Sequence, residues 1–257
     1  MSESLQSLLS FATETAYTAG RLTLGYFQSG LRPDFKPDDS PVTIADRKAE
    51  ELVRARIQAR YPHHAIVGEE LGASGHEGAS HRWFVDPIDG TKSFMRGVPL
   101  YAVLLGLEIE GQPSVGAAYF PALDEMIAAA SGQGCWWNGR PARVSTVTTM
   151  AKAYVAFTDP VSFARHGRAE AWERIQQAAW YRTGWSDAYG YLLVATGRVE
   201  LMLDPVMSVW DCGPFPPILQ EASGYFGDWQ GNPTIHGGEA LATSQALLPE
   251  VLKLING

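Results

Sequence analysis

The sequence predicts an α/β protein made of two subdomains that pack against each other. Its 257 residues are enough for one to two domains with a large buried core. The content of 46% hydrophobic and 19% charged residues is typical of globular proteins. Helix-like and strand-like segments alternate irregularly along the chain. We place the boundary near residues 145–152, which gives an N-terminal α/β subdomain of residues 1–147 and a C-terminal α/β subdomain of residues 148–257.

Two amphipathic helices are predicted at the start of the chain. The first has apolar residues at steps of three and four, namely Leu5, Leu8, Leu9, Ala12, Ala16, Leu24 and Phe27. A loop rich in proline and aspartate follows at residues 36–41. The second helix has its apolar face at Ala49, Leu52, Val53 and Ile57, and Pro62 ends it.

Strands are predicted for most of the segment that follows. Their apolar, β-branched and aromatic residues occupy 65–67, 83–85, 98–109, 114–120 and 126–130, separated by Gly, Pro and Asp turns. Residues 72–81 are rich in Gly, Ser and His, a composition typical of a mobile surface loop. Trp136 and Trp137 precede an Asn-Gly turn signal and are expected to pack in a hairpin.

The C-terminal half mixes both kinds of element. Helices are predicted near residues 169–179, 187–195 and 249–255 and after Asp211, and strands at 200–203, 225–229 and 240–243. Three prolines at 214, 216 and 217 are compatible only with the first turn of a helix. We therefore expect the helix after Asp211 to begin late or to be irregular.

Composition and charge exclude several classes of function. The 28 acidic and 20 basic residues give a net charge of −8, which argues against a nucleic-acid partner. The negative charge does not exclude an anionic substrate, because a bound metal ion inverts the local field. Cys135 and Cys212 lie far apart in sequence and match no disulfide framework or zinc-ligand spacing, so a reducing cytoplasm is expected.

No membrane association is expected. The most apolar run, residues 98–107, has 10 residues, whereas a membrane helix needs about 20. The first apolar stretch has no basic residues before it, so no signal peptide is predicted.

The segment Asp86-Pro-Ile-Asp89-Gly90-Thr91 is the most informative of the chain. It follows an apolar strand, and its proline-stiffened turn lets two carboxylates point at one spot. The backbone N–H groups of Gly90 and Thr91 are then placed as they are in phosphate-binding turns. The ordinary alternative is a strand-to-turn junction, where Asp, Pro and Gly are common for conformational reasons.

Other carboxylates also stand at the ends of predicted elements. They are Asp46, the pair Glu69 and Glu70, and Asp211. Asp46 and Asp211 have an ordinary alternative role as helix N-caps. Carboxylates so placed suit a hard cation, and Mg²⁺ in particular combines a few carboxylates with substrate phosphate. The pattern predicts metal-assisted phosphoryl transfer to water.

Four segments resemble the inositol monophosphatase superfamily of Mg²⁺-dependent phosphatases. They are VTIADRKAE (42–50), IVGEE (66–70), WFVDPIDGTKSF (83–94) and WDCG (210–213), in order and in register across nearly the whole chain. The resemblance implies a layered αβαβα sandwich of the inositol-monophosphatase/fructose-bisphosphatase type. It also implies a homodimer, with two or three Mg²⁺ ions between the two halves of each chain.

The resemblance also implies roles for individual residues. The metal ligands would be Glu69, Asp86, the Ile88 carbonyl, Asp89 and Asp211. Glu70 would support this shell, and Thr91, linked to Asp46, would orient and help to deprotonate the attacking water. The N–H groups of Gly90 and Thr91 would hold the phosphate. One metal then lowers the pKa of the water, and another stabilises the leaving alkoxide.

Two later segments are similar to the histidinol-phosphatase branch of this superfamily. They are GWSDAYGY (184–191) and GYFGDW (224–229). The similarity implies that Asp187 and Asp204 contact the organic half of the substrate. The ammonium and imidazole of histidinol phosphate favour carboxylate partners, although the hydroxyls of inositol can also donate to carboxylates. Ordinary alternatives are a helix N-cap for Asp187 and a turn former for Asp204.

The leading prediction is therefore Mg²⁺-dependent hydrolysis of a small-molecule phosphate ester, L-histidinol phosphate. The alternatives are an inositol monophosphatase, a broad-specificity phosphatase of the same superfamily, or a catalytically silent metal-binding protein that keeps the fold. A silent protein would have lost a ligand or Thr91, and none is lost. Phosphatases of the haloacid-dehalogenase type are excluded, because their D-x-D-G-T spacing is one residue shorter than that of Asp86 and Asp89.

Four histidines and Arg182 belong to no recognised motif. His63, His64, His76 and His81 have no ligand spacing and are predicted to be solvated surface residues. Arg182 has two open roles, lining the site or pairing with an acidic side chain.

Overall fold

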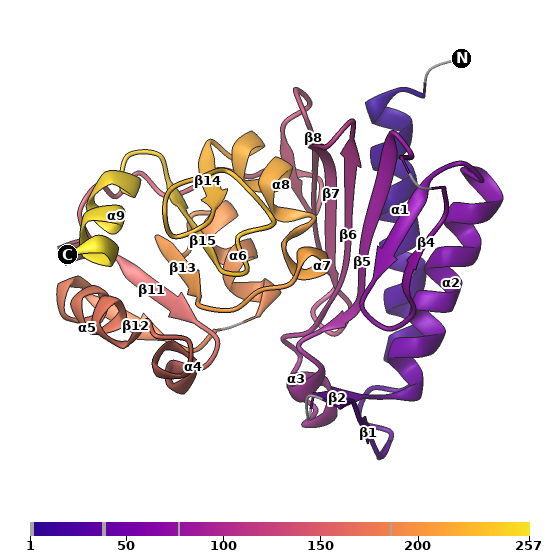
Figure 1. The fold of residues 1–257 in the computed structure, drawn as a ribbon, viewed down its shortest axis with the longest axis horizontal. Coiled ribbons are helices and arrows are strands. Elements are labelled where there is room, and N and C mark those ends of the chain that lie inside the picture. The colour runs from indigo at the N-terminus through magenta and orange to yellow at the C-terminus, as the bar shows by residue number, and fades with distance from the viewer. Residues whose placement is uncertain (1–2, 38–39, 77, 186) are drawn as a thin grey trace.

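Two β-sheets, each packed between helices, organise the molecule (Figure 1). The computed structural model describes residues 3–37, 40–76, 78–185 and 187–257. The larger sheet has eight strands in the order β10-β9-β8-β7-β6-β5-β3-β4, and the smaller has five in the order β12-β11-β13-β15-β14. β1 (Asp34–Phe35) and β2 (Pro41–Val42) form a separate two-stranded ribbon.

The eight-stranded sheet contains β3 (Ala65–Gly68), β4 (Gly72–Ser74), β5 (His81–Asp89), β6 (Ala102–Ile109), β7 (Gln112–Phe120), β8 (Glu125–Ala130), β9 (Cys135–Trp137) and β10 (Arg140–Pro141). The five-stranded sheet contains β11 (Tyr154–Phe157), β12 (Tyr181–Thr183), β13 (Leu201–Asp204), β14 (Gly224–Gly227) and β15 (Ala240–Ser244). The helices are α1 (Leu5–Leu24), α2 (Ile44–Arg60), α3 (Thr91–Met95), α4 (Pro160–Arg165), α5 (Ala169–Ala178), α6 (Ala188–Ala195), α7 (Val209–Cys212), α8 (Phe215–Glu221) and α9 (Leu248–Asn256), with a 3₁₀ turn at Met150–Lys152.

The sheets and helices alternate in five layers. The apolar faces of α1 and α2 cover one face of the eight-stranded sheet, where Leu8, Ala12 and Val53 belong to the same buried cluster as Trp83. α6 and α8 fill the space between the two sheets. α5 and α9 cover the outer face of the five-stranded sheet, on the opposite side of the molecule from α1 (Figure 1). The layered αβαβα architecture expected from the sequence is confirmed.

The strand order brings the predicted site residues to one edge of the large sheet. β3 runs parallel to β5, so Gly68 lies opposite Val85, and the Glu69 N–H donates to the Val85 carbonyl at 3.1 Å. The β5–β6 register shifts between Asp86 and Asp89, which lets the strand bend before it ends. The ends of β3 and β5 therefore meet where the chain turns into α3.

Most predicted elements are present, with shifted ends. β6 begins at Ala102 rather than at residue 98, and the first helix ends at Leu24. α8 begins at Phe215 with two prolines in its first turn, so the expected late start is confirmed. The hairpin around Asn138 is also confirmed, because β9 pairs with β10. Neither α4 nor the ribbon of β1 and β2 was predicted.

Two predictions about the segment 63–81 are wrong. Residues 72–74 are not loop but form β4, which pairs antiparallel with β3. His64 is not a solvated residue, since its side chain is only 11% exposed. Its ring stacks on those of Tyr61 and His81, at centroid distances of 4.7 and 4.4 Å, and Nδ1 accepts a 3.0 Å hydrogen bond from Trp83 Nε1. The start of β5 brings Trp83 and His81 beside the end of α2, which local sequence does not reveal.

Residues 142–153 connect the two sheets. The division of the chain at residues 147 and 148 stays a prediction. Among the described residues, no helix combines the length and the apolar character needed to cross a bilayer.

Candidate active site

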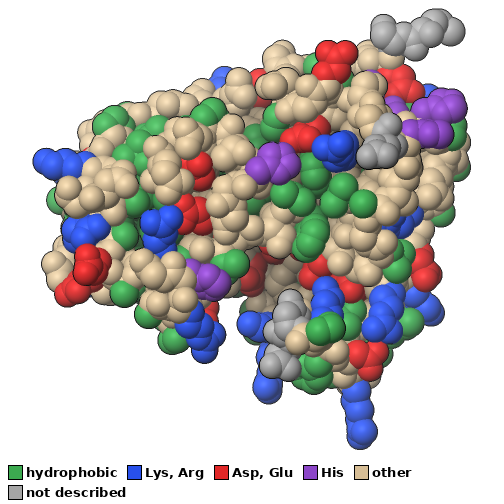
Figure 2. All heavy atoms as spheres, in the orientation of Figure 1, with side chains coloured by type: hydrophobic (Ala, Val, Ile, Leu, Met, Phe, Trp, Pro, Cys, Tyr) green, Lys and Arg blue, Asp and Glu red, His purple; other side chains and the backbone are tan. Residues whose placement is uncertain are grey.

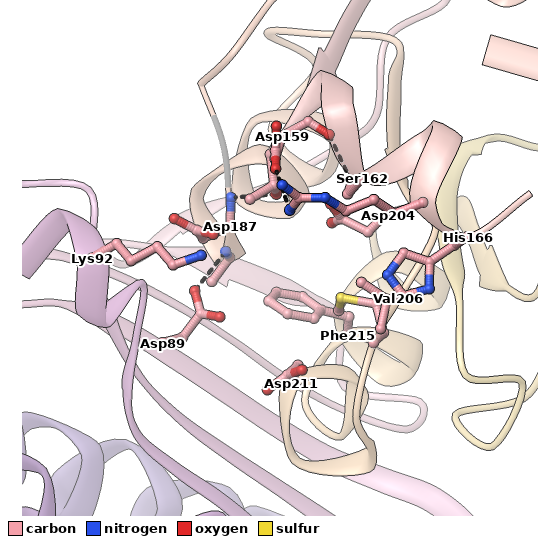
Figure 3. A pocket seen from close by; sticks show the side chains of 14 residues that line it. Asp89, Lys92, Asp159, Ser162, His166, Asp187, Asp204, Val206, Asp211 and Phe215 are labelled. Carbon is pink, nitrogen blue, oxygen red and sulfur yellow. Dashed lines mark hydrogen bonds and ion pairs between the residues drawn. The ribbon is translucent and has the colours of Figure 1, made fainter. Parts of the chain in front are cut away.

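Two adjoining cavities lie between the sheets, at the ends of β3, β5 and β13. The main cavity, of about 650 Å³, is lined by residues of the first half, among them Glu69, Asp86 and Thr91, and by residues of the second half such as Asp211. The α4 cavity, of about 280 Å³, continues from it toward α4 and is shown in Figure 3. Several residues line both, including Asp89, Lys92, Asp187 and Asp211.

Three aspartates from two elements meet in the main cavity, and we call them the aspartate trio. Asp86 and Asp89 come from β5 and Asp211 from α7, and each offers a carboxylate oxygen within 4.8 Å of the other two. Asp211 Oδ2 also accepts a 2.9 Å hydrogen bond from the Ser208 N–H at the start of α7. Ser208 is therefore the N-cap of α7, and Asp211 is the N3 residue of its capping box rather than the N-cap that the sequence offered as an alternative.

The trio has the electrostatic properties of a cation site. Burial raises the pKa of Asp86 well above its usual value, and the charges of Glu69, Asp89 and Asp211 add to this effect. Burial also raises the pKa of Asp89, and it raises that of Asp211 to about 7. Repulsion between buried carboxylates is relieved when a cation binds. A donor set made only of oxygens fits a hard ion such as Mg²⁺.

Glu69 and Glu70 lie beside the trio and are paired with a lysine that was not predicted from the sequence. Lys36 Nζ is 2.7 Å from Glu69 Oε1 and 2.8 Å from Glu70 Oε1. Burial alone would lower the pKa of Lys36, but hydrogen bonds to the two glutamates raise it above its usual value. Burial raises the pKa of Glu70 to about 7. No pattern in the neighbouring sequence indicates this role of Lys36, because the tertiary fold brings Lys36 to Glu69.

A buried ion pair braces the turn that carries these glutamates. Glu50, on α2, accepts hydrogen bonds from the Glu70 N–H at 2.7 Å and from Arg54 Nε at 2.7 Å. A Cβ at Gly68 would lie 2.1 Å from Glu50 Oε1, so this contact requires a glycine. Glu50 is the last residue of the segment 42–50, and its i,i+4 spacing to Arg54 is the signal that could have revealed the pair.

Thr91 and Asp46 are brought together as expected. Thr91 Oγ1 lies 3.1 Å from the Ile88 carbonyl oxygen and 3.5 Å from Asp46 Oδ1. Asp46 Oδ2 accepts hydrogen bonds from the N–H and the hydroxyl of Thr43, at 2.8 and 2.5 Å. Burial raises the pKa of Asp46. Asp46 therefore belongs to the capping box of α2 and at the same time faces the Thr91 hydroxyl.

Gly90 is conformationally required at the turn between β5 and α3. Its φ of +79° lies in the left-handed region. A Cβ there would stand 3.1 Å from the Leu100 carbonyl oxygen and 3.2 Å from Asp187 Oδ2. Asp187, from the second half of the chain, thus packs directly against the turn of the first half.

Asp187 and Asp204 both line the α4 cavity (Figure 3). Asp187 precedes α6 with a φ of +52° and makes no side-chain capping hydrogen bond to that helix, so capping does not explain its presence. Asp204, at the end of β13, is only 4% exposed and accepts a 2.9 Å hydrogen bond from the Tyr191 hydroxyl. Burial raises its pKa to about 8. The structure thus brings both aspartates beside the trio.

α4 supplies a wall of the α4 cavity that sequence reasoning missed. The residues of this segment that line the cavity are Asp159, Ser162, Arg165 and His166. Arg165 Nη1 lies 3.9 Å from Asp159 Oδ2. Arg182 has a local role instead, because its Nη1 donates to the Ala179 carbonyl at 2.8 Å and the residue lines neither cavity.

Known proteins are similar to this chain over most of its length. A model of the inositol monophosphatase family matches residues 4–256. The histidinol-phosphatase of Chlorobaculum parvum is 42% identical over 237 residues, which cover 92% of this chain and 91% of that protein. The histidinol-phosphatase of Mycobacterium tuberculosis is 39% identical over 231 residues, 88% of each chain. The inositol-1-monophosphatase of Mesorhizobium japonicum is 30% identical over 255 residues, 97% of this chain and 96% of that protein.

Solved structures share the fold. An inositol monophosphatase from Zymomonas mobilis superposes with a TM-score of 0.89 at 26% identity and covers 100% of both chains. The extragenic suppressor protein suhB from Bartonella henselae has a TM-score of 0.89 at 25% identity, covering 97% of this chain and 98% of its own. These matches confirm the predicted enzyme class, a phosphoric monoester hydrolase, and show that the chain belongs to the inositol monophosphatase family.

Proposed function

We propose that this enzyme hydrolyses L-histidinol phosphate to L-histidinol and phosphate, with Mg²⁺ as its metal. The observation that carries the proposal is the α4 cavity, which adjoins the aspartate trio and is lined by Asp159, Asp187 and Asp204. Carboxylates placed there match a substrate whose organic half is cationic. Curated relatives named histidinol-phosphatase, at 34–42% identity, support the same substrate.

The trio, with Glu69 and the Ile88 carbonyl, would hold two or three Mg²⁺ ions. When bound, Mg²⁺ lowers the pKa of the attacking water and stabilises the charge of the leaving alkoxide. Thr91 Oγ1 would orient that water by accepting a hydrogen bond from it, and the threonine hydroxyl itself donates to Asp46 Oδ1. Glu70 supports Glu69 through their shared partner Lys36.

The two ends of the substrate are bound by different halves of the chain. In this proposal the backbone N–H groups of Gly90 and Thr91 hold the phosphate. Asp187 and Asp204 accept hydrogen bonds from the ammonium and imidazole groups. A neutral inositol ring offers these side chains no positive charge, whereas a cationic alcohol would stabilise the ionised form of Asp204 against the effect of its burial, so the cationic alcohol is favoured.

We further infer a homodimer that works in the cytoplasm. The dimer rests on the family resemblance. The compartment is supported by Cys135 and Cys212, which are both buried free thiols.

The test compares phosphate release from histidinol phosphate and from inositol 1-phosphate, each with Mg²⁺ and with EDTA. We expect kcat/KM to be about 100-fold higher for histidinol phosphate, which corresponds to about 2.7 kcal/mol of transition-state preference. EDTA should abolish release, and added Mg²⁺ should restore it. Comparable rates for the two esters would indicate a broad-specificity phosphatase, and a preference for inositol 1-phosphate would contradict the assignment of substrate.

A further inference from the structure

Lys92 stands out among the residues that line the main cavity. It follows Thr91 on α3, and of the described residues lining this cavity it is the one lysine or arginine. The carboxylates that line the same cavity are Glu69, Asp86, Asp89, Asp159, Asp187 and Asp211. Lys92 lines the α4 cavity as well, and Figure 3 shows its side chain extending from α3 toward Asp89 and Asp187.

The ammonium group of Lys92 has no partner among the described residues. No hydrogen bond or ion pair joins it to any of them, although carboxylates surround it. Lys36 differs, since it is held by both Glu69 and Glu70. Lys92 is also exposed, so its flexible side chain can adjust to a ligand without breaking an existing contact.

We propose that Lys92 binds a non-bridging oxygen of the substrate phosphate. A phosphate monoester brings up to two negative charges, and the neighbouring carboxylates are neutralised when cations occupy the trio. Lys92 directly follows Thr91 and is the one lysine or arginine among the described residues that line the main cavity, and a charge-assisted hydrogen bond to phosphate is the strong kind. This inference rests on the proposed function only in requiring a phosphate monoester, whatever alcohol the ester carries.

The competing role for Lys92 is contact with the organic half of the substrate through Asp187. Inorganic phosphate separates the two roles, because it has no organic half. Its affinity for the Mg²⁺-loaded protein can be measured by calorimetry without turnover, and its inhibition constant can be measured with any ester that the enzyme hydrolyses.

The variants are Lys92→Gln, which removes the charge, and Lys92→Arg, which keeps it. Arg96→Gln is the matched control, because Arg96 is the C-cap residue of the same helix, is exposed and lines neither cavity. We expect Lys92→Gln to weaken phosphate binding about 10- to 100-fold, the range for losing a hydrogen bond to a charged group. Lys92→Arg should recover most of it, and Arg96→Gln should bind phosphate as the wild type does. The Mg²⁺ concentration for half-maximal activity should not change.

Unchanged phosphate affinity in Lys92→Gln would overturn the proposal, and so would a change in KM for a cationic ester alone. Lys92→Met serves as a second neutral variant, and thermal unfolding shows whether each variant is folded. The substrate assignment can be refuted independently of the role of Lys92. If the wild-type enzyme does not hydrolyse histidinol phosphate but hydrolyses another ester, the effect of Lys92→Gln on phosphate binding can still be measured.

Discussion

The backbone N–H of Ala188 donates a 2.7 Å hydrogen bond to Oδ2 of Asp89, across 99 residues of sequence. Ala188 is the first residue of α6, in the second half of the chain, and Asp89 is the last residue of β5, in the first half. The bond holds one carboxylate of the trio in a fixed orientation. The metal site that we propose is therefore shaped by a contact between the two halves of the chain and not by β5 alone.

Replacing Ala188 by proline tests this relationship. Proline is tolerated at the first position of a helix, but it removes the N–H and places ring atoms where the Asp89 carboxylate now lies. We expect weaker Mg²⁺ binding and a fall in kcat/KM of at least about 10-fold, the cost of losing a hydrogen bond to a charged group. Titration of activity with Mg²⁺ measures both. Ala188→Gly keeps the N–H and should retain the wild-type Mg²⁺ dependence; if it behaves like the proline variant, the hydrogen bond is not the cause.

Thr91→Ala removes the hydroxyl that faces Asp46 and the Ile88 carbonyl. If this hydroxyl orients the attacking water, kcat should fall about 100-fold or more, the usual size of an acid–base contribution. The Mg²⁺ affinity should stay close to the wild-type value, because no predicted ligand is lost. Thr91→Ser keeps a hydroxyl and is expected to recover most of the turnover. A Thr91→Ala variant that no longer binds Mg²⁺ would give Thr91 a structural role instead.

Asp187→Asn tests the recognition of the cationic half of the substrate. The amide keeps the size of the side chain and removes its charge, so kcat/KM for histidinol phosphate should fall about 10- to 100-fold through KM. The kcat/KM for a phosphate ester of a neutral alcohol should fall far less. Steady-state kinetics on both esters decide the matter, and equal losses on the two would refute the assignment of Asp187.

His64 should make folding stability depend on pH. Burial is the main cause that lowers its pKa to about 4, and protonation would also remove the acceptor that Nδ1 offers to Trp83. The unfolded chain binds this proton near pH 6.5, so the folded state loses stability as the pH falls from 6.5 toward 4. At pH 4.5 the loss is on the order of 2 kcal/mol.

The measurement is the free energy of unfolding by urea at pH 7 and pH 4.5. His64→Gln does not titrate and should lose less stability between the two pH values than the wild type. His76→Gln removes an exposed imidazole that does not contribute to the pKa of His64 and serves as the control. If His64→Gln loses as much stability as the wild type, the buried imidazole is not the group responsible.

Local patterns were enough to predict most of the elements and many of the site residues. The three- and four-residue steps of α1 and α2 locate their buried faces, and the apolar runs locate the strands of both sheets. The carboxylates at the ends of β3, β5 and α7 could be singled out because side chains at the ends of elements converge when the strands are neighbours. Asp86, Asp89 and Asp211 do converge in the structure.

Long-range contacts account for what the sequence did not reveal. His64 was expected to be solvated, because nothing near it in sequence shows that Trp83 and His81 will cover it. Lys36 contacts Glu69, which lies 33 residues further along the chain. The proline-rich loop around Lys36 contains no sequence pattern that indicates this partner.

The sequence by itself thus determined most of the segments that become helices and strands, and which acidic residues stand at their ends. Those properties depend on side-chain periodicity and turn chemistry within a few residues. Only the tertiary structure decided that Ala188 holds Asp89, that Glu50 and Arg54 brace the turn of Glu69, and that Lys92 faces the carboxylates without a partner. Hydrogen bonds and burial of charge depend on distances between segments far apart in the chain, and those distances exist only once the two sheets have packed together.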